Sequence, residues 1–184
     1  MTAPSRELLI GVTGGIAAFK TAALVSQLVQ SGLGVTVVMT EAAEQFVGRA
    51  TFEALTGRRV YSHVFGNDDT PLGAHIQLAQ RAQLLCVAPA TAHFLAQAAH
   101  GLAGDLLTTL YLAFRGPVIV APAMNCEMWE HAAVQRNVAQ LRADGVQIVD
   151  PEEGWLSCRT RGAGRMASPE TIRATIDRVL SATS

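Results

Sequence analysis

Short, uninterrupted apolar runs alternate with helix-like segments through almost the whole chain of 184 residues. Five of these runs are expected to be strands buried on both faces, because their hydrophobicity is continuous rather than alternating. They are 8–12, 35–39, 84–88, 118–121 and 146–149. Strands of this kind belong to parallel sheets covered by helices on each side, which restricts the fold to the α/β class.

The segments between these runs carry apolar residues at helical spacing. Four helices are expected there, over 16–30, 42–55, 94–113 and 132–143. A last helix is expected over 169–180, where Ser168 is placed to cap the helix and Pro169 to occupy its first position. The alternation predicts one doubly wound, mostly parallel sheet, Rossmann-like or flavodoxin-like, with helices on both faces. A single domain over residues 1–184 fits this length.

The composition argues against several classes of function. Only 16% of the residues are charged while 49% are hydrophobic, so we expect some apolar surface to be buried between subunits of a homo-oligomer. A net charge of -1 without a basic run gives no support for a nucleic-acid partner. No segment suggests a membrane span or a secretion signal. Three cysteines at unrelated spacings indicate neither disulfides nor a metal site, and we expect a cytoplasmic protein.

Ligands of such folds bind beyond the carboxyl ends of the strands, which directs attention to the loops there. In the first loop, GVTGGIA, Gly14 and Gly15 precede a helix whose free N–H groups and dipole form an anion site. The spacing matches neither a dinucleotide fingerprint nor a P-loop. The phosphate of a mononucleotide is one interpretation, and a tight turn that simply needs glycine is an equal one.

Two further segments are ambiguous when each is taken alone. In APATA, residues 88–92, the small side chains would let a flat ring approach the backbone, but Thr91 before a helix is more simply a helix cap. His75 lies where a loop enters an apolar helical stretch, and a lone histidine is more often structural than catalytic.

The segment PAMNCEMW, which follows the strand expected over 118–121, has an unusual composition for a loop. One amide, Asn125, stands among Met124, Met128 and Trp129. A single polar group in an apolar pocket mouth is typical of a site that fixes the orientation of a ligand.

The segment GWLSCRTRGAGRM contains Cys158 among three glycines and three arginines. We expect it to be a loop that closes over a bound ligand, with arginines that lower the pKa of the thiol. A mobile surface loop with an incidental cysteine is the alternative.

Together these segments resemble the homo-oligomeric flavin-containing cysteine decarboxylases over nearly the whole chain. The resemblance runs in order through GVTGGIAAFK, VVMTEAAEQFV, AHIQLA, APATA with GLAGDLLTT, PAMNCEMW and SCRTRGAGRM. The motif Pro-Ala-Met-Asn-x-x-Met-Trp is the most specific part, because it separates this family from the similar prenylated-flavin synthases. The chain departs from the family pattern at Arg159-Thr160, where Gly-Asp is common, and at His93, where Asn or Asp is usual.

The resemblance implies FMN as the cofactor and assigns roles to particular residues. His75, Asn125 and Cys158 stand at the catalytic positions, and residues 157–166 form a segment that covers the substrate. The substrate would be bound by Asn125, Met128, Arg165 and Met166. FMN would be held by Gly14, Gly15, Ile16, Thr40, Phe46, Ala88, Pro89, Ala90 and Thr91.

The implied reaction is the decarboxylation of 4'-phosphopantothenoylcysteine to 4'-phosphopantetheine in coenzyme A biosynthesis, through thiol oxidation to a thioaldehyde, loss of CO2 and re-reduction of the enethiol. Asn125 would bind the substrate carboxylate and Cys158 would protonate the enethiolate, while His75 would either accept the thiol proton or orient the carboxylate. We expect Arg159 and Arg161 to face the substrate phosphate.

The resemblance also implies a trimer, or a dodecamer assembled from trimers, with FMN at the subunit interface. A separate phosphopantothenoylcysteine synthetase is an implied partner. Two alternatives stay open: a peptidyl-cysteine decarboxylase with the same chemistry, and a non-catalytic FMN-binding regulatory subunit.

Overall fold

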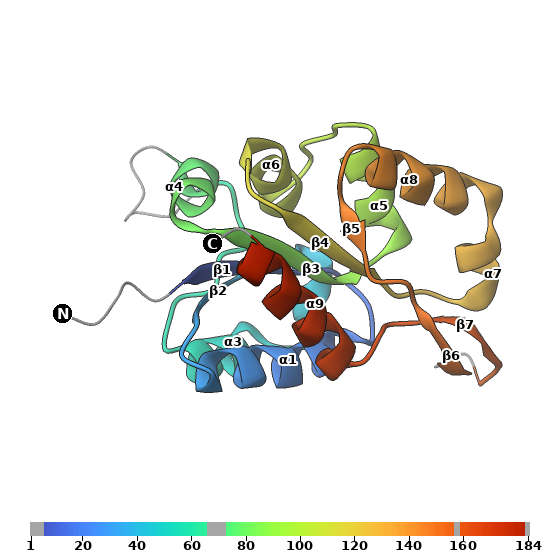
Figure 1. Ribbon diagram of the computed structural model, residues 1–184, viewed down its shortest axis with the longest axis horizontal. Coiled ribbons are helices and arrows are strands. Elements are labelled where there is room, and N and C mark those ends of the chain that lie inside the picture. Colours follow the sequence, from blue (N-terminus) through green and yellow to red (C-terminus); the bar gives the residue numbers. More distant parts are fainter. Residues whose placement is uncertain (1–5, 66–72, 157–158, 183–184) are drawn as a thin grey trace.

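Five parallel strands form the centre of the computed structural model, which describes residues 6–65, 73–156 and 159–182. The strand order is β2-β1-β3-β4-β5, and all four neighbouring pairs are parallel (Figure 1). The strands are β1 (Glu7–Val12), β2 (Gly34–Met39), β3 (Leu84–Ala90), β4 (Val118–Pro122) and β5 (Gln147–Ile148). The predicted parallel α/β sheet is therefore confirmed.

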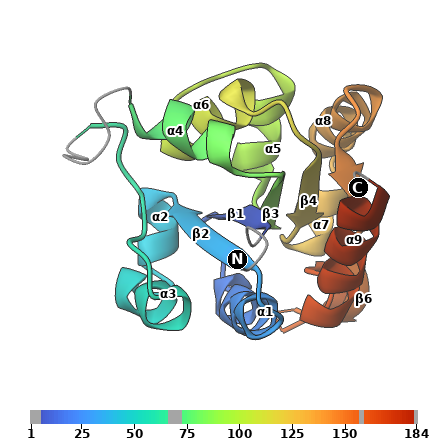
Figure 2. The same ribbon diagram turned by 60° about the vertical axis from the view of Figure 1, so that its left-hand side comes forward.

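Helices cover both faces of this sheet, as Figures 1 and 2 show. One face packs on α1 (Ala18–Gln30), α3 (Arg49–Thr56) and α9 (Pro169–Ala182). The other packs on α4 (Ala74–Arg81), α5 (Ala92–Ala99), α6 (Leu106–Ala113) and α8 (Ala132–Ala143). Two short helices, α2 (Glu41–Glu44) and α7 (Cys126–Glu130), directly follow β2 and β4.

The continuous apolar runs divide their side chains between two cores, because successive residues of a strand point to opposite faces. In β1, Leu8 and Ile10 belong to the core shared with α1 and α9, whereas Leu9 belongs to the core shared with α5 and α6. Burial on both faces explains why no polar residue alternates in these strands.

Two of the predicted long helices are each interrupted. The helix expected over 42–55 is α2 and α3, separated by residues 45–48, and the helix expected over 94–113 is α5 and α6. In the second case Gly101 takes a left-handed conformation with φ of 65°, and the Asp105 carboxylate then accepts the Thr108 N–H at 2.8 Å to start a new helix. Apolar spacing continues across such breaks, so periodicity alone does not locate them.

The start of the last helix follows its prediction. Ser168 Oγ accepts the Thr171 N–H at 3.1 Å, and Pro169 is the first residue of α9. Within the described residues, we find no helix long and apolar enough to cross a lipid bilayer.

The arginine-rich segment near the C-terminus is the clearest error of the sequence-based description. Residues expected to form a loop contain an antiparallel hairpin, β6 (Glu152–Trp155) and β7 (Arg161–Arg165), which lies outside the main sheet (Figure 1). The sequence RGAGR of β7 has no apolar alternation and two glycines, which are rare in strands. Glycine in a strand often marks a close approach of another backbone, and the structure shows such an approach here.

Candidate functional site

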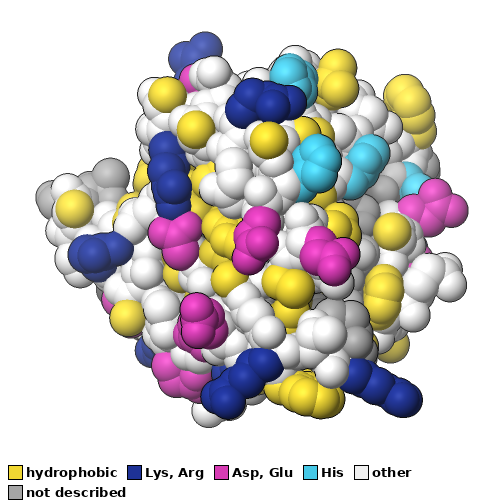
Figure 3. Space-filling model, turned by 90° about the vertical axis from the view of Figure 1, so that its right-hand side faces the viewer, with side chains coloured by type: hydrophobic (Ala, Val, Ile, Leu, Met, Phe, Trp, Pro, Cys, Tyr) yellow, Lys and Arg dark blue, Asp and Glu magenta, His cyan; other side chains and the backbone are white. Residues whose placement is uncertain are grey.

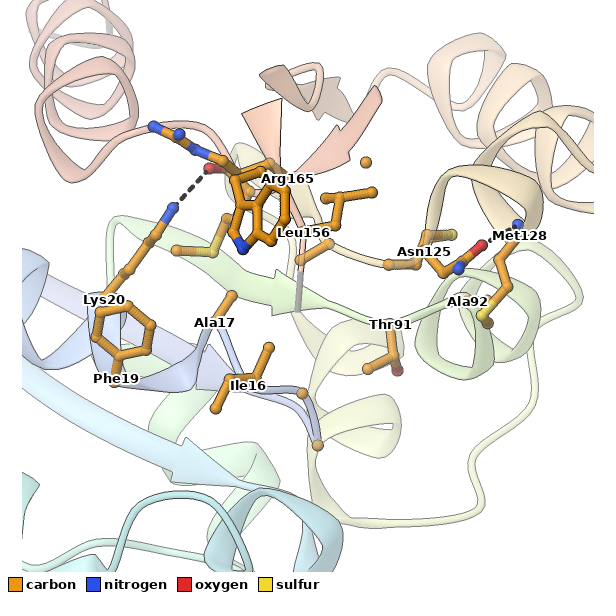
Figure 4. A pocket seen from close by; sticks show the side chains of 17 residues that line it. Ile16, Ala17, Phe19, Lys20, Thr91, Ala92, Asn125, Met128, Leu156 and Arg165 are labelled. Carbon is orange, nitrogen blue, oxygen red and sulfur yellow. Dashed lines mark hydrogen bonds between the residues drawn. The ribbon is translucent and has the colours of Figure 1, made fainter. Parts of the chain in front are cut away.

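A cavity of about 690 Å³ lies at the carboxyl edge of the sheet, within the size range of small-ligand sites (Figure 4). Four segments line it: the start of α1, the start of α5, the loop from β4 into α7, and the β6–β7 hairpin. The strand ends therefore bring together segments that lie far apart in the sequence, as the parallel topology predicts.

The start of α1 presents unused backbone donors to this cavity. Gly15 N donates to Thr13 O at 2.9 Å, while the N–H groups of Gly14, Ile16 and Ala17 find no acceptor among the described residues. These groups, together with the helix dipole, make the turn suited to an anion. A methyl group at Gly14 would overlap Ala42, so the turn also needs glycine for packing. Both interpretations drawn from the sequence therefore have structural support.

Thr91 caps α5, accepting the Phe94 N–H at 3.3 Å, and its own N–H donates to Thr13 Oγ1 at 3.0 Å. Thr40 caps α2 in the same way by accepting the Ala43 N–H at 3.3 Å. Each hydroxyl keeps its hydrogen for donation to a ligand. Both threonines line a second cavity of about 520 Å³, which shares Gly14, Thr91, Ala92 and Met128 with the first. The two cavities therefore adjoin each other at the starts of α1 and α5.

The other residues proposed to hold a cofactor line neither cavity. Ala88, Pro89 and Ala90 are buried in β3, and the Ala88 and Ala90 carbonyls accept hydrogen bonds from Thr21 Oγ1 and Ala123 N. Phe46 is half-exposed and lines neither cavity. Their contact with a cofactor stays a prediction.

Asn125 lines the main cavity and caps the short helix α7. Its Oδ1 accepts the Glu127 N–H at 2.7 Å and the Met128 N–H at 3.4 Å. Because the oxygen is held by the helix start, the Nδ2 hydrogens are the groups left to bind a ligand. Met124 and Met128, which also line the cavity, surround this amide with apolar surface.

The hairpin closes one side of the cavity with Trp155, Leu156, Gly164 and Arg165, and Met166 follows directly. Trp155 is 66% exposed although it lines the cavity, and Phe19 of α1 is 59% exposed beside it. Figure 3 views this end of the molecule and shows hydrophobic side chains among acidic and basic ones. Such exposed apolar surface around a cavity is typical of a binding site.

Two cations lie close together on this wall of the cavity. Lys20 Nζ donates to the Met166 carbonyl at 3.3 Å (Figure 4). An Arg165 nitrogen lies 3.6 Å from a Glu152 carboxylate oxygen. Burial lowers the pKa of Lys20, and the Arg165 charge lowers it further, while Glu152 acts in the opposite direction. Lys20 was not identified from the sequence, although it lies four residues after Ile16 in the helix expected over 16–30, a spacing that places side chains on one face.

Of the three catalytic positions, His75 and Asn125 can be compared, and the structure does not bring these two together in one chain. His75 begins α4, lines neither cavity, and α4 lies at the far end of the molecule from the hairpin (Figures 1 and 2). Cys158 lies outside the described residues. Arg159 and Arg161 do not line the cavity, and the guanidinium that does is that of Arg165.

The cysteines with described surroundings differ in burial. Cys86 is fully buried in β3, and this burial raises its pKa to about 12, so it stays a thiol at neutral pH. Cys126 is half-buried at the start of α7. Cys86 is therefore unsuited to acid–base or nucleophilic work.

A parallel sheet with an anion-binding helix start and an apolar cavity at its carboxyl edge defines an α/β protein that binds a mononucleotide-type cofactor. Residues 2–181 match the model of the family described as Flavoprotein, and the chain belongs to that family.

Individual relatives agree with this assignment. The chain is 46% identical over 168 residues to the coenzyme A biosynthesis bifunctional protein CoaBC of Bacillus subtilis, covering 91% of this chain and 41% of the relative. The chain thus spans about two fifths of the length of that curated protein. The solved structure of the FMN-dependent cysteine decarboxylase SpaF has a TM-score of 0.84 at 36% identity, covering 99% of both chains. A PPC decarboxylase variant complexed with pantothenoylaminoethenethiol has a TM-score of 0.85 at 26% identity, covering 96% of this chain and 99% of the other.

Gly14 and Gly48 provide a matched test of the turn before α1. Gly14→Ala should strongly reduce flavin retention, because its methyl group would overlap Ala42, whereas an added Cβ at Gly48, before α3, would meet nothing within 4 Å and Gly48→Ala should retain flavin. The visible flavin absorbance per protein after purification measures this difference. Equal retention by both variants would contradict the role given to the turn.

Proposed function

We propose that this chain is an FMN-dependent decarboxylase that converts 4'-phosphopantothenoylcysteine into 4'-phosphopantetheine during coenzyme A biosynthesis. The observation that carries the proposal is one cavity lined by a neutral amide donor, Asn125, by a helix start suited to an anion, and by two cations. The bifunctional coenzyme A biosynthesis relative and the PPC decarboxylase structure support the assignment.

The residues present fit FMN. The N–H groups at the start of α1 would bind its phosphate, and the absence of a side chain at Gly15 leaves room for a flat ring near Thr91. Thr40 and Thr91 would donate hydrogen bonds from the adjoining cavity. When bound, FMN supplies reversible two-electron redox chemistry, which no protein side chain of this site offers.

Asn125 would hold the substrate carboxylate through its Nδ2 hydrogens. A neutral donor orients the carboxylate without stabilising its charge as strongly as a cation would, so loss of CO2 keeps its driving force. Met124 and Met128 would exclude water from this position and so strengthen the hydrogen bond.

Lys20 and Arg165 would bind the phosphate of the substrate. Burial, and then the nearby Arg165 charge, lower the pKa of Lys20, and a bound dianion would favour the charged form of Lys20 and relieve the repulsion between the two cations. This arrangement favours a phosphorylated small substrate over a peptide terminus. A peptidyl-cysteine decarboxylase is therefore only the second candidate.

The site would be completed by a second subunit. His75 lies far from Asn125 within one chain, so we propose that a neighbouring copy supplies His75 to the cavity, in a trimer or a dodecamer of trimers. The exposed apolar side chains around the cavity, including Ile16 and Phe19, would be covered in that assembly. His75 would then accept the thiol proton or orient the carboxylate.

Further assignments accompany this proposal. We propose one domain over residues 1–184, with 157–166 as the segment that covers the substrate and Cys158 as the proton donor to the enethiolate. The cysteine content fits a reducing cytoplasm. The synthetase activity would come from a separate protein or from a further domain like that of the bifunctional relatives.

The substrate assignment is tested with phosphorylated and unphosphorylated pantothenoylcysteine. The protein should release CO2 from the phosphorylated compound with the higher kcat/KM. Lys20→Gln should lower that value by about ten- to a hundredfold, because a charged hydrogen bond contributes about 1.5–3 kcal/mol, and should leave the other substrate little affected. CO2 release from a cysteine-ended peptide alone would contradict the assignment.

Asn125→Asp separates the helix cap from the chemistry. Aspartate caps α7 as well as asparagine does, so the variant should fold and retain FMN. It offers no N–H donor and repels the carboxylate, and we expect decarboxylation to fall by at least about a hundredfold. If the purified variant does not retain flavin, Asn125 has a structural role.

Subunit mixing tests the shared site. His75→Asn and Asn125→Asp homo-oligomers should each be inactive, but oligomers refolded from a mixture should regain activity, because some interfaces would combine one intact His75 with one intact Asn125. No recovery in confirmed mixed oligomers would place both residues in the same chain's site.

A further inference from the structure

We propose that Gly164 is a positioning residue for Asn125, and that β7 and the start of α7 form one unit. The role of Asn125 rests on the proposed function, whereas the mechanical connection between the two segments does not. Gly164 would act on the carboxylate-binding amide from the hairpin, without touching the reacting atoms of the substrate.

A backbone hydrogen bond connects the two segments directly. The N–H of Met124, the residue immediately before Asn125, donates to the Gly164 carbonyl at 2.9 Å. Gly164 is buried and has φ of 130°, a conformation that residues with a side chain rarely adopt. The hairpin therefore fixes the backbone of Met124, the residue to which Asn125 is bonded.

The lack of a side chain at Gly164 is what permits this contact. A Cβ atom there would overlap the Met124 carbonyl oxygen and lie 3.4 Å from both Asn125 C and Cys126 N. Two residues earlier on the same side of β7, a Cβ at Gly162 would lie 3.0 Å from Cys126 Cβ. The glycine side of β7 thus packs on backbone and Cβ atoms at the start of α7.

The helix that follows Asn125 is too short to fix the amide by itself. α7 has five residues, and an isolated helix of this length is not stable in water. The cap bonds from Glu127 and Met128 orient the amide relative to α7, but they do not locate α7 in the molecule. The contact with β7 supplies that location.

The same strand carries a cation of the cavity wall. Arg165 follows Gly164 directly and lines the cavity, so a ligand anion held by Arg165 also fixes the peptide that holds Met124. The anionic end of the ligand, held by Arg165, and its carboxylate, held by Asn125, would in this way be connected through the adjacent residues Gly164 and Arg165. Binding at the cationic wall would reduce the motion of Asn125.

Hydrogen exchange tests the connection without any substrate. In Gly164→Ala, the amides of Met124, Glu127 and Met128 should each exchange at least about tenfold faster than in the unmodified FMN-loaded protein. Gly145→Ala is the matched control, because Gly145 also has positive φ, of 87°, but an added Cβ would meet nothing within 4 Å. In that variant the three amides should keep their protection.

The relative exchange rates of the three amides show whether Gly164 acts on Asn125. Faster exchange of Met124 alone, with Glu127 and Met128 still protected, would show that the hairpin detaches without disturbing Asn125 and would overturn it. If Gly164→Ala fails to fold, Gly162→Ala gives the second measurement, because its methyl group would press on Cys126. Protection of all three amides in a folded Gly162→Ala protein would likewise overturn the proposal.

A double-mutant cycle then separates positioning from general destabilisation. Gly164→Ala should lower kcat/KM by at least about tenfold, mainly through kcat, but should cause little further loss in an Asn125→Ala protein. Additive losses would contradict action through Asn125. If the wild-type protein lacks decarboxylase activity, the proposed function fails while the exchange result still stands.

Discussion

The buried hydroxyl of Thr13 joins the two helix starts on which the cavity depends. Thr13 Oγ1 donates to the Pro89 carbonyl at 2.7 Å and accepts the Thr91 N–H at 3.0 Å, with only 1% of the residue exposed. These bonds fix the end of β1 against the end of β3, so the anion-binding turn before α1 and the cap of α5 keep a constant separation. A buried hydroxyl with both partners satisfied is a rigid connection, and the ligand-binding loops are built on it.

Much of this framework could be predicted because it follows from burial and backbone chemistry. Continuous apolar runs gave the five strands, and the rule for strand ends identified the turn at Gly14, the cap at Thr91 and the amide at Asn125. The breaks within the helices escaped detection because the apolar spacing continues through Gly101 and Asp105. Local capping, rather than periodicity, decides where such a helix restarts.

The parts that the sequence did not predict depend on contacts between distant segments. β7 has no strand-like pattern, since its glycine side packs on backbone and Cβ atoms of α7 rather than in an apolar core. Lys20 gains its significance only from Arg165, which lies near it on the cavity wall although it comes 145 positions later in the chain. The proposed combination of His75 with Asn125 would depend on a second copy of the chain, which no pattern within one sequence describes.

The burial of Cys86 makes the stability of this fold sensitive to strong alkali. Its pKa rises from 9.0 to about 12 on folding, so the folded state favours the thiol over the thiolate. That contribution to the free energy of unfolding is fully present below pH 9.0 and is lost progressively as the pH rises toward 12. Strong base would thus weaken the centre of the sheet by ionising a sulfur atom that alkylating reagents cannot reach while the sheet is intact.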